Sequence, residues 1–395
     1  MLNKNKPVEQ IAPEQHEKKK KLPVFFLRRV LPLLAVLAIV LLVSVLSTML
    51  DDNHFTALRR YLKYGNSSET QDLYTYASHQ RNLFEPLGDE LLVVNPYSIQ
   101  ILHEDGTTLY ELQVNLNSPM LSGGAELAAV CDAGGDTVYV LSSAGLRWTH
   151  VNADQLLCYS VRVCGDDHVV IVEQKFGYKA SVCVYDKEGT LVFRFDSHDR
   201  YLSDAIVTKD GQTLAVLAPG EDGGTFSSSL IVYDLATAQR KGVYPVVDGL
   251  GLDIAVTSSQ AMILCDDRLS IVSFSGELLL DYPYEELYLH DYTLGSSDFC
   301  ALLLSRYQSS NVCTLTTFSP DGEILAQMNL SDEVLDISAA GDRLAVLYSD
   351  TLVLYDRTLN EVARLNGTEH AGIVRMDHDG TALLIAETSA RRFLP

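Results

Sequence analysis

Hydrophobic and polar residues alternate with a period of two from about residue 80 to the C-terminus. Short runs rich in Val, Ile, Leu and Tyr are separated by turns made of Gly, Asp and Ser. Alternation of this kind, bounded by turn residues, is typical of half-buried β-strands. The pattern therefore predicts an all-β domain over residues 80–395.

The predicted strands recur as a composite unit made of two strand–turn–strand halves. The first half occurs at residues 98–112, 181–195, 229–244, 268–282, 312–328 and 351–365. Between residues 181 and 351 its copies start 39 to 48 residues apart. The second half alternates with the first at residues 203–217, 252–265, 333–347 and 372–386, with a less clear copy ending at 301–304.

A repeated four-stranded unit of roughly 40–50 residues is typical of a β-propeller. One such sheet leaves both of its faces exposed, whereas stacking like sheets around a closed ring buries both faces and removes long free edges. The inner strands must then be apolar on both faces. Eight runs meet this requirement, namely residues 91–94, 137–141, 168–172, 214–218, 262–265, 301–304, 344–348 and 382–386.

Eight blades are therefore favoured, with seven as the close alternative. The unit at residues 125–157 shows only one clear strand pair, and the C-terminal run 381–395 is incomplete. Residues 72–90 are available to supply the missing strands and close the ring. A pair of two-sheet β-sandwiches is the alternative architecture, although it does not require so regular a repeat.

A different pattern lies near the N-terminus, where residues 30–50 form an apolar run without any charged side chain. A helix of this length spans the roughly 30 Å hydrocarbon core of a bilayer. Lys18 to Lys21, Arg28 and Arg29 precede the run, which predicts a cytoplasmic N-terminus. We expect a single-pass protein of the cell membrane whose C-terminal domain is extracytoplasmic. A cleaved signal peptide is the alternative, but the run exceeds the usual length of such a segment.

These patterns divide the chain into four parts. Residues 1–29 are expected to be a disordered basic cytoplasmic tail, 30–50 a transmembrane helix, 51–79 a stalk and linker, and 80–395 an extracytoplasmic β-propeller.

The charge of the chain is divided unevenly between these parts. Residues 1–29 carry eight Lys and Arg against three Glu, whereas the remainder carries 22 against 49 Asp and Glu, within a total formal charge of −22. The basic tail suits an anionic lipid surface, and the bilayer is an expected partner through the helix at residues 30–50. The acidic remainder should repel phosphates, which argues against nucleic acid as a partner.

The seven cysteines mostly lie in apolar, strand-like runs, and they are Cys131, Cys158, Cys164, Cys183, Cys265, Cys300 and Cys313. No C-x-x-C pair occurs, so neither a zinc ribbon nor a thioredoxin-type motif is supported. Their interpretation as buried small hydrophobic residues is favoured.

No catalytic motif is present in the sequence. H-E-x-x-H, G-x-S-x-G, the P-loop and the EF-hand pattern are all missing, and no two histidines have helical ligand spacing. We therefore predict no catalytic residue, no cofactor-binding residue, no cofactor and no metal ligand.

Three features of the sequence have both a functional interpretation and an ordinary structural one. The loop Gly220 to Gly224 (GEDGG) could bind a cation through its carboxylates, but a solvated turn is favoured. A tyrosine-rich stretch could form a binding face, although blade packing is favoured; it contains Tyr282, Tyr284, Tyr288 and Tyr292. The adjacent carboxylates Asp166-Asp167 and Asp266-Asp267 are poor acid–base pairs because neighbouring strand residues point to opposite faces.

The chain resembles an uncharacterised Firmicutes (clostridial) family of single-pass membrane proteins with an extracytoplasmic β-propeller, a domain of unknown function. The resemblance covers roughly residues 20–395 and is carried by YSIQIL (97–102), GYKASVCVYD (177–186) and GTFSSSLI (224–231). It implies no catalytic residues. The similarity to WD-repeat proteins is architectural only, because Trp148 is the sole Trp and no Asp follows it.

The expected function is a membrane-anchored extracytoplasmic propeller that binds a protein or a cell-envelope component without catalysis. An enzyme that acts on glycans or other envelope substrates through the central funnel is the alternative, because acids from different blades can meet at the axis. A sensor that relays a signal through the short tail ranks last, since residues 1–29 contain no output domain.

Overall fold

The computed structural model describes residues 71–394 except 154, 165–166, 223, 247–248, 296–297, 309 and 378–379. The predicted tail, the transmembrane helix and residues 51–70 of the stalk lie outside the described residues. Within the described residues, no helix has the length and apolar character needed to cross a membrane.

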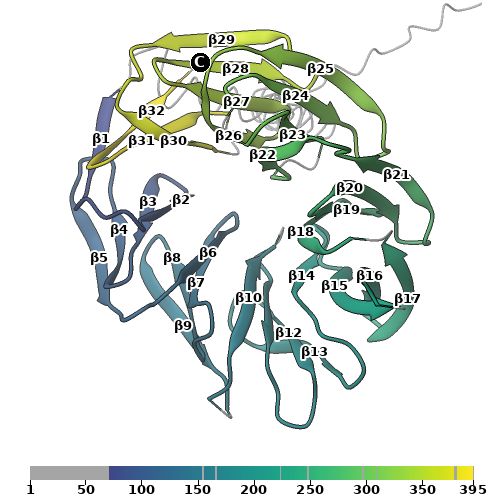
Figure 1. Ribbon diagram of the computed structural model, residues 1–395. Helices are drawn as coiled ribbons and strands as arrows, with labels where there is room; N and C mark the ends of the chain where they lie inside the picture. Colours follow the sequence, from purple (N-terminus) through teal and green to yellow (C-terminus); the bar gives the residue numbers. More distant parts are fainter. Residues whose placement is uncertain are drawn as a thin grey trace, which may run out of the picture. The chain divides into compact units, whose positions relative to one another are not determined.

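The described chain forms eight four-stranded antiparallel sheets, here called blades 1 to 8 (Figure 1). Seven blades take four consecutive strands, and blade 8 takes β30, β31, β32 and β1. Blades 1 to 4 consist of β2 (Leu83–Leu87), β3 (Glu90–Val94), β4 (Ser98–Leu102), β5 (Thr108–Gln113), β6 (Pro119–Gly123), β7 (Leu127–Asp132), β8 (Thr137–Ser142), β9 (Gly145–Val151), β10 (Cys158–Val163), β11 (Val169–Glu173), β12 (Ala180–Tyr185), β13 (Leu191–Ser197), β14 (Asp204–Val207), β15 (Thr213–Asp222), β16 (Thr225–Asp234) and β17 (Gln239–Val246). Blades 5 to 8 consist of β18 (Gly251–Val256), β19 (Gln260–Cys265), β20 (Arg268–Ser273), β21 (Leu278–Pro283), β22 (Tyr288–Thr293), β23 (Cys300–Ser305), β24 (Cys313–Phe318), β25 (Ile324–Leu330), β26 (Val334–Ala340), β27 (Arg343–Tyr348), β28 (Thr351–Asp356), β29 (Glu361–Asn366), β30 (Ala371–Met376), β31 (Ala382–Ala386), β32 (Ser389–Phe393) and β1 (Gln71–Thr75).

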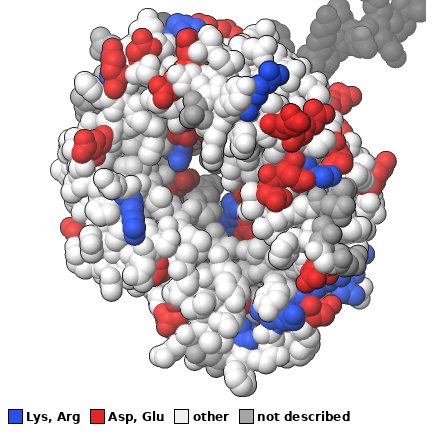
Figure 2. Space-filling view, in the orientation of Figure 1, with Lys and Arg blue, Asp and Glu red and all other residues white. Residues whose placement is uncertain are grey.

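The blades follow one another around a ring with a hollow at its centre (Figures 1 and 2). Eight hydrophobic clusters hold the ring together, and each joins one blade to the next, including blade 8 to blade 1. The number of clusters equals the number of blade junctions, so the ring is closed. The eight-bladed propeller favoured from the sequence is confirmed, and the sandwich alternative is wrong.

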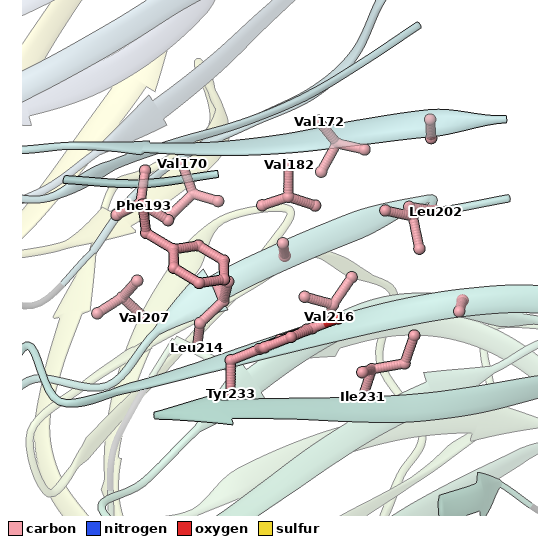
Figure 3. Packing of buried hydrophobic residues seen from close by; sticks show 14 of the residues in the cluster. Val170, Val172, Val182, Phe193, Leu202, Val207, Leu214, Val216, Ile231 and Tyr233 are labelled. Atoms are coloured by element: carbon pink, nitrogen blue, oxygen red, sulfur yellow. The ribbon is translucent and has the colours of Figure 1, made fainter. Parts of the chain in front are cut away.

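The second strand of a blade shows why the ring is stable. In β15, Leu214 and Val216 pack toward blade 3, while Ala215 and Leu217 pack toward blade 5. Successive side chains on a strand point to opposite faces, so an unbroken apolar run serves two junctions at once. Burying a Val or Leu side chain contributes about 1.5–3 kcal/mol. Figure 3 shows the junction of blades 3 and 4, where Phe193 and Val182 face Leu214 and Val216.

One predicted inner strand has a different place in its blade. Residues 137–141 lie in β8, the third strand of blade 2, whereas the second strand is β7. Blade 2 is complete, although its sequence showed only one clear strand pair. The signal was weak because Ala128 and Ala129 supply little hydrophobicity, yet both are buried between blades.

The ring is closed by a strand from the other end of the domain. Strand β1 pairs with β32, Gln71 opposite Arg392 and Thr75 opposite Ser389. The Tyr76 hydroxyl donates to the carbonyl oxygens of Ala386 and Ser389 at 2.7 and 2.8 Å. The expectation that residues 72–90 help to complete the C-terminal sheet is confirmed. The predicted boundary at residue 80 is wrong, because β1 and Tyr76 belong to the ring and not to a stalk.

Antiparallel pairing within every blade gives the ring two distinct faces. The connections between first and second strands and between third and fourth strands lie on one face, the turn face. The connections between second and third strands and between successive blades lie on the other, the loop face. Because β1 is the fourth strand of blade 8, the chain enters the ring at the turn face, at Gln71.

Candidate functional site

Large aromatic side chains are exposed on one face of the ring. Six are between 52% and 83% exposed, and they are Tyr97, Phe176, Tyr201, Phe226, Tyr288 and Tyr307. Each lies in, or at the end of, a connection of the loop face. None of the strongly exposed aromatic residues in the described part of the chain lies on the turn face. Clustered exposed aromatic side chains mark binding surfaces, because aromatic residues are enriched at the centre of protein interfaces.

The tyrosine-rich stretch of blades 5 and 6 does not form one surface. Tyr282 packs edge-on against Phe318, with ring centroids 4.9 Å apart. Tyr284 is buried, and its hydroxyl donates to the carbonyl oxygens of Cys265 and Arg268 at 3.2 and 2.9 Å. Only Tyr288 of the four reaches the loop face, so blade packing explains most of this stretch.

The loop that begins at Gly220 is part of a long hairpin. Strands β15 and β16 pair through Asp222 opposite Thr225, and this extension carries the exposed Phe226. In the described residues, no group of three His, Cys, Asp or Glu side chains is placed to hold a metal ion. The hairpin therefore contributes an aromatic side chain to the loop face.

The adjacent carboxylates have structural partners. Asp167 is buried, and its Oδ1 accepts hydrogen bonds from the backbone N–H groups of Glu126 and Leu127 at 3.0 and 3.1 Å. Asp266 Oδ1 accepts from the N–H of Leu250 at 2.9 Å, and Asp267 pairs with the neighbouring Arg268. Asp166 lies outside the described residues.

A second polar region lies beside the ring axis. Four aspartates occupy the same position on the first strands of blades 4 to 7, each opposite a leucine of the second strand, and they are Asp204, Asp253, Asp291 and Asp336. A β-bulge immediately precedes three of them. Bulges re-aim side chains. Figure 2 shows charged side chains of both signs in the central hollow.

Arg162 of blade 3 links two of these aspartates. Its guanidinium pairs with Asp204 of blade 4 and with Asp253 of blade 5. The Tyr292 hydroxyl of blade 6 donates to the other oxygen of Asp253 at 3.1 Å. Burial acts to lower the pKa of Arg162, but the two carboxylates more than offset it, so the guanidinium stays charged. One network thus ties blades 3 to 6 together beside the axis.

The other two aspartates join neighbouring blades through the backbone. Asp291 accepts a hydrogen bond from the N–H of Ile337 in blade 7 at 3.1 Å, and Asp336 accepts from the N–H of Val374 in blade 8 at 2.8 Å. Arg375 also donates to Asp336 at 2.9 Å. Burial raises the pKa of Asp291 to about 6, although two backbone N–H groups act against the rise. These two side chains therefore connect neighbouring blades by hydrogen bonds.

Glu85 differs from the aspartates because it has no hydrogen-bond partner among the described residues. It lies on β2, and its side chain packs over Gly123 of blade 2, where an added Cβ would approach Glu85 Oε1 to 2.2 Å. Burial raises the pKa of Glu85 to about 7; Arg375 acts to lower it and Asp377 to raise it. The side chain nevertheless keeps partial solvent access. It is therefore a carboxylate that can change its charge near neutral pH.

The sequence repeat contains a signal for the axial aspartates. Asp204, Asp253 and Asp336 each precede an apolar residue, Ala or Ile, in aligned copies of the second repeat half. A carboxylate at the same position in several repeat copies indicates that these residues have the same structural role beside the axis. The exposed aromatic residues had no such signal, since Tyr and Phe also occur throughout the buried strands.

The fold and these sites define the class of the protein as an eight-bladed β-propeller. The chain belongs to a family of unknown function, DUF5711, whose model matches residues 58–385. A search of curated protein sequences gives no match.

Solved structures support the fold at low sequence identity. The computationally designed Ika8 protein is 12% identical with a TM-score of 0.58, and the match covers 82% of this chain and all of that one. BamB from Moraxella catarrhalis is 13% identical with a TM-score of 0.51, covering 82% and 100%. The C-terminal WD40 domain of Sif2 is 12% identical with a TM-score of 0.58, covering 84% and 100%.

Proposed function

We propose that this propeller is a binding module for a protein or another cell-envelope component, and that its loop face makes the contact. The observation that carries the proposal is that the six strongly exposed aromatic side chains of the described residues all lie on that face. Leaving six large apolar groups in water brings no benefit to folding, whereas a partner that covers them gains their burial. The structural similarity to BamB and to a WD40 domain is consistent with such a module.

The proposal includes a membrane tether formed by residues 30–50, with the propeller on the extracytoplasmic side. The apolar run and the basic residues before it support this topology. The described chain enters the ring at Gln71 on the turn face, which is the face opposite the exposed aromatic side chains. Protease added to intact cells should degrade the propeller while the N-terminal tail stays protected; an untouched propeller would refute the topology.

Site-specific photocrosslinking in the native membrane tests the loop face. A photoreactive phenylalanine analogue at Phe176 or Tyr307 should cross-link reproducibly to one partner. The same analogue at Lys187 or Glu188, on the turn face, is the matched control. Cross-linking that is equal at both faces, or that occurs only at the turn face, would contradict the proposal.

An enzyme that works in the axial hollow is the second candidate, and Glu85 is the observation that favours it. A carboxylate whose pKa lies near neutral is suited to general acid–base catalysis. The four axial aspartates are less suited, because they are engaged with backbone N–H groups, Tyr292 or Arg162 and Arg375. Turnover of an envelope glycan by the wild type but not by E85Q would favour this candidate.

A further inference from the structure

The loop face of blade 6 combines apolar and acidic side chains in one patch. It consists of the described residues of the three connections that enter, cross and leave this blade, 284–287, 306–308, 310–312 and 331–333, together with the first residues of β22 and β26. Five exposed apolar side chains belong to it, and they are Leu287, Tyr288, Tyr307, Val312 and Leu335. Four exposed carboxylates belong to the same connections, and they are Glu285, Glu286, Asp332 and Glu333. We call this set the blade 6 patch.

The carboxylates of the blade 6 patch are not neutralised by the described residues. None of the four has a hydrogen bond or an ion pair with a described side chain, in contrast to Asp267, which pairs with Arg268. Arg306 is the one cation in the three connections, so the patch carries a net charge of −3. Exposed carboxylates without a counterion attract a cationic partner and shape its encounter rate.

The backbone that presents these groups is held in place. The buried Tyr284 hydroxyl bonds to the carbonyl oxygens of Cys265 and Arg268, immediately before Glu285 and Glu286. The inner strands β22 and β26 begin at Tyr288 and Val334, so they fix the two outer connections. A preorganised surface loses less conformational entropy when a partner binds.

We propose that the blade 6 patch binds a basic, partly apolar segment of a partner protein. Lys and Arg side chains fit a surface that offers carboxylates beside Tyr288 and Tyr307, because ion pairs and cation–π contacts then act together. The five apolar side chains provide burial for the apolar residues of the same segment. An anionic lipid surface or an acidic polymer is disfavoured by the charge of −3. This inference rests on the proposed binding function and specifies its partner.

A defined peptide tests the charge preference of the full-length chain in detergent micelles. The probe is a fluorescein-labelled 14-residue peptide of alternating Lys and Leu, and an alternating Glu and Leu peptide is its counterpart. Fluorescence anisotropy should show binding of the Lys–Leu peptide, weakened by added salt, and no comparable binding of the Glu–Leu peptide.

Neutralising the patch should lower the affinity for the Lys–Leu peptide about tenfold, which is equivalent to about 1.4 kcal/mol of binding free energy. The variant is E285Q/E286Q/D332N/E333Q. The matched control is E126Q/E188Q/E277Q/E323Q, which removes four exposed carboxylates from turn-face connections and should change the affinity less than about twofold. Equal weakening by both variants would show that total acidity alone attracts the peptide, and the proposal would be overturned.

The same variant separates this inference from the proposed function. If photocrosslinking at Tyr307 in native membranes persists in the neutralised variant, the binding function stands and the basic partner is wrong. If the wild type gives no loop-face cross-link, the binding function itself fails. Self-association that is lost in the neutralised variant would identify a second copy of this chain as the occupant and would also overturn the proposal.

Discussion

Replacement of Glu85 by Gln should change how the stability of the propeller depends on pH. Glu85 lies next to the ring axis without a hydrogen-bond partner among the described residues, and burial raises its pKa from 4.5 to about 7. An acid with a raised pKa binds its proton more tightly in the folded state than in the unfolded state. Its ionisation therefore destabilises the fold, and the wild type should lose stability as the pH rises from about 4.5 to about 7.

The size of the effect follows from the pKa change. One pKa unit corresponds to about 1.4 kcal/mol, so a rise from 4.5 to about 7 means that full ionisation of Glu85 costs at most about 3–4 kcal/mol. Partial solvent access from the hollow makes this an upper bound. E85Q keeps the size of the side chain and cannot ionise, so the variant should match the wild type near pH 4 and exceed it above pH 7.

Urea unfolding of the full-length chain in detergent measures this difference. Trp148, the sole tryptophan, lies on β9 and packs against Gly189 of blade 3, so its fluorescence reports on the ring. The control is E126Q, which removes an exposed carboxylate from the neighbouring turn. Its stability should depend on pH as that of the wild type does. A constant difference between E85Q and wild type from pH 4 to 8, or a less stable E85Q at pH 8, would refute the reasoning.

Three further changes test the ring. Tyr74→Ala in the buried closing strand should cost about 3–5 kcal/mol in urea unfolding, and an effect below 1 kcal/mol would show that β1 is dispensable. Gly123→Ala should cost about 1–3 kcal/mol because its Cβ meets Glu85, and less in an E85A background; simple additivity would contradict this contact. Arg162→Met should cost about 3–5 kcal/mol because it leaves the Asp204 and Asp253 carboxylates without their cation, and it should cost less in a D204N/D253N background; equal costs in both backgrounds would argue against the ion pairs. All seven buried cysteines should resist alkylation by iodoacetamide in the folded protein and react in urea. Mass spectrometry can count the alkylated cysteines.

The ring architecture was predictable because burial imposes a regular sequence pattern on it. The second strand of each blade packs against both neighbouring blades, so runs such as 214–218 and 344–348 stay apolar without a break. The contribution of the segment before residue 90 was also foreseeable, since the last sheet was one strand short. Blade 2 was harder to read, because the buried strand β7 contains the small residues Ala128 and Ala129.

The candidate sites were less predictable because they depend on residues far apart in the sequence. Arg162 and Asp253 are 91 positions apart, and only closure of the ring brings them together. The same holds for Glu85, whose environment includes Gly123 and Arg375. Exposure of Tyr288 but burial of Tyr284, four residues earlier, follows from the local path of the chain, which composition cannot supply.

The pairing of β1 with β32 has a consequence for biogenesis. Strand β1 has no pairing partner until β32, residues 389–393, has been synthesised about 315 positions later. Translation at about 5–20 residues per second makes this delay tens of seconds. A truncation before Ser389 should therefore leave the first strand unpaired and the whole ring prone to proteolysis.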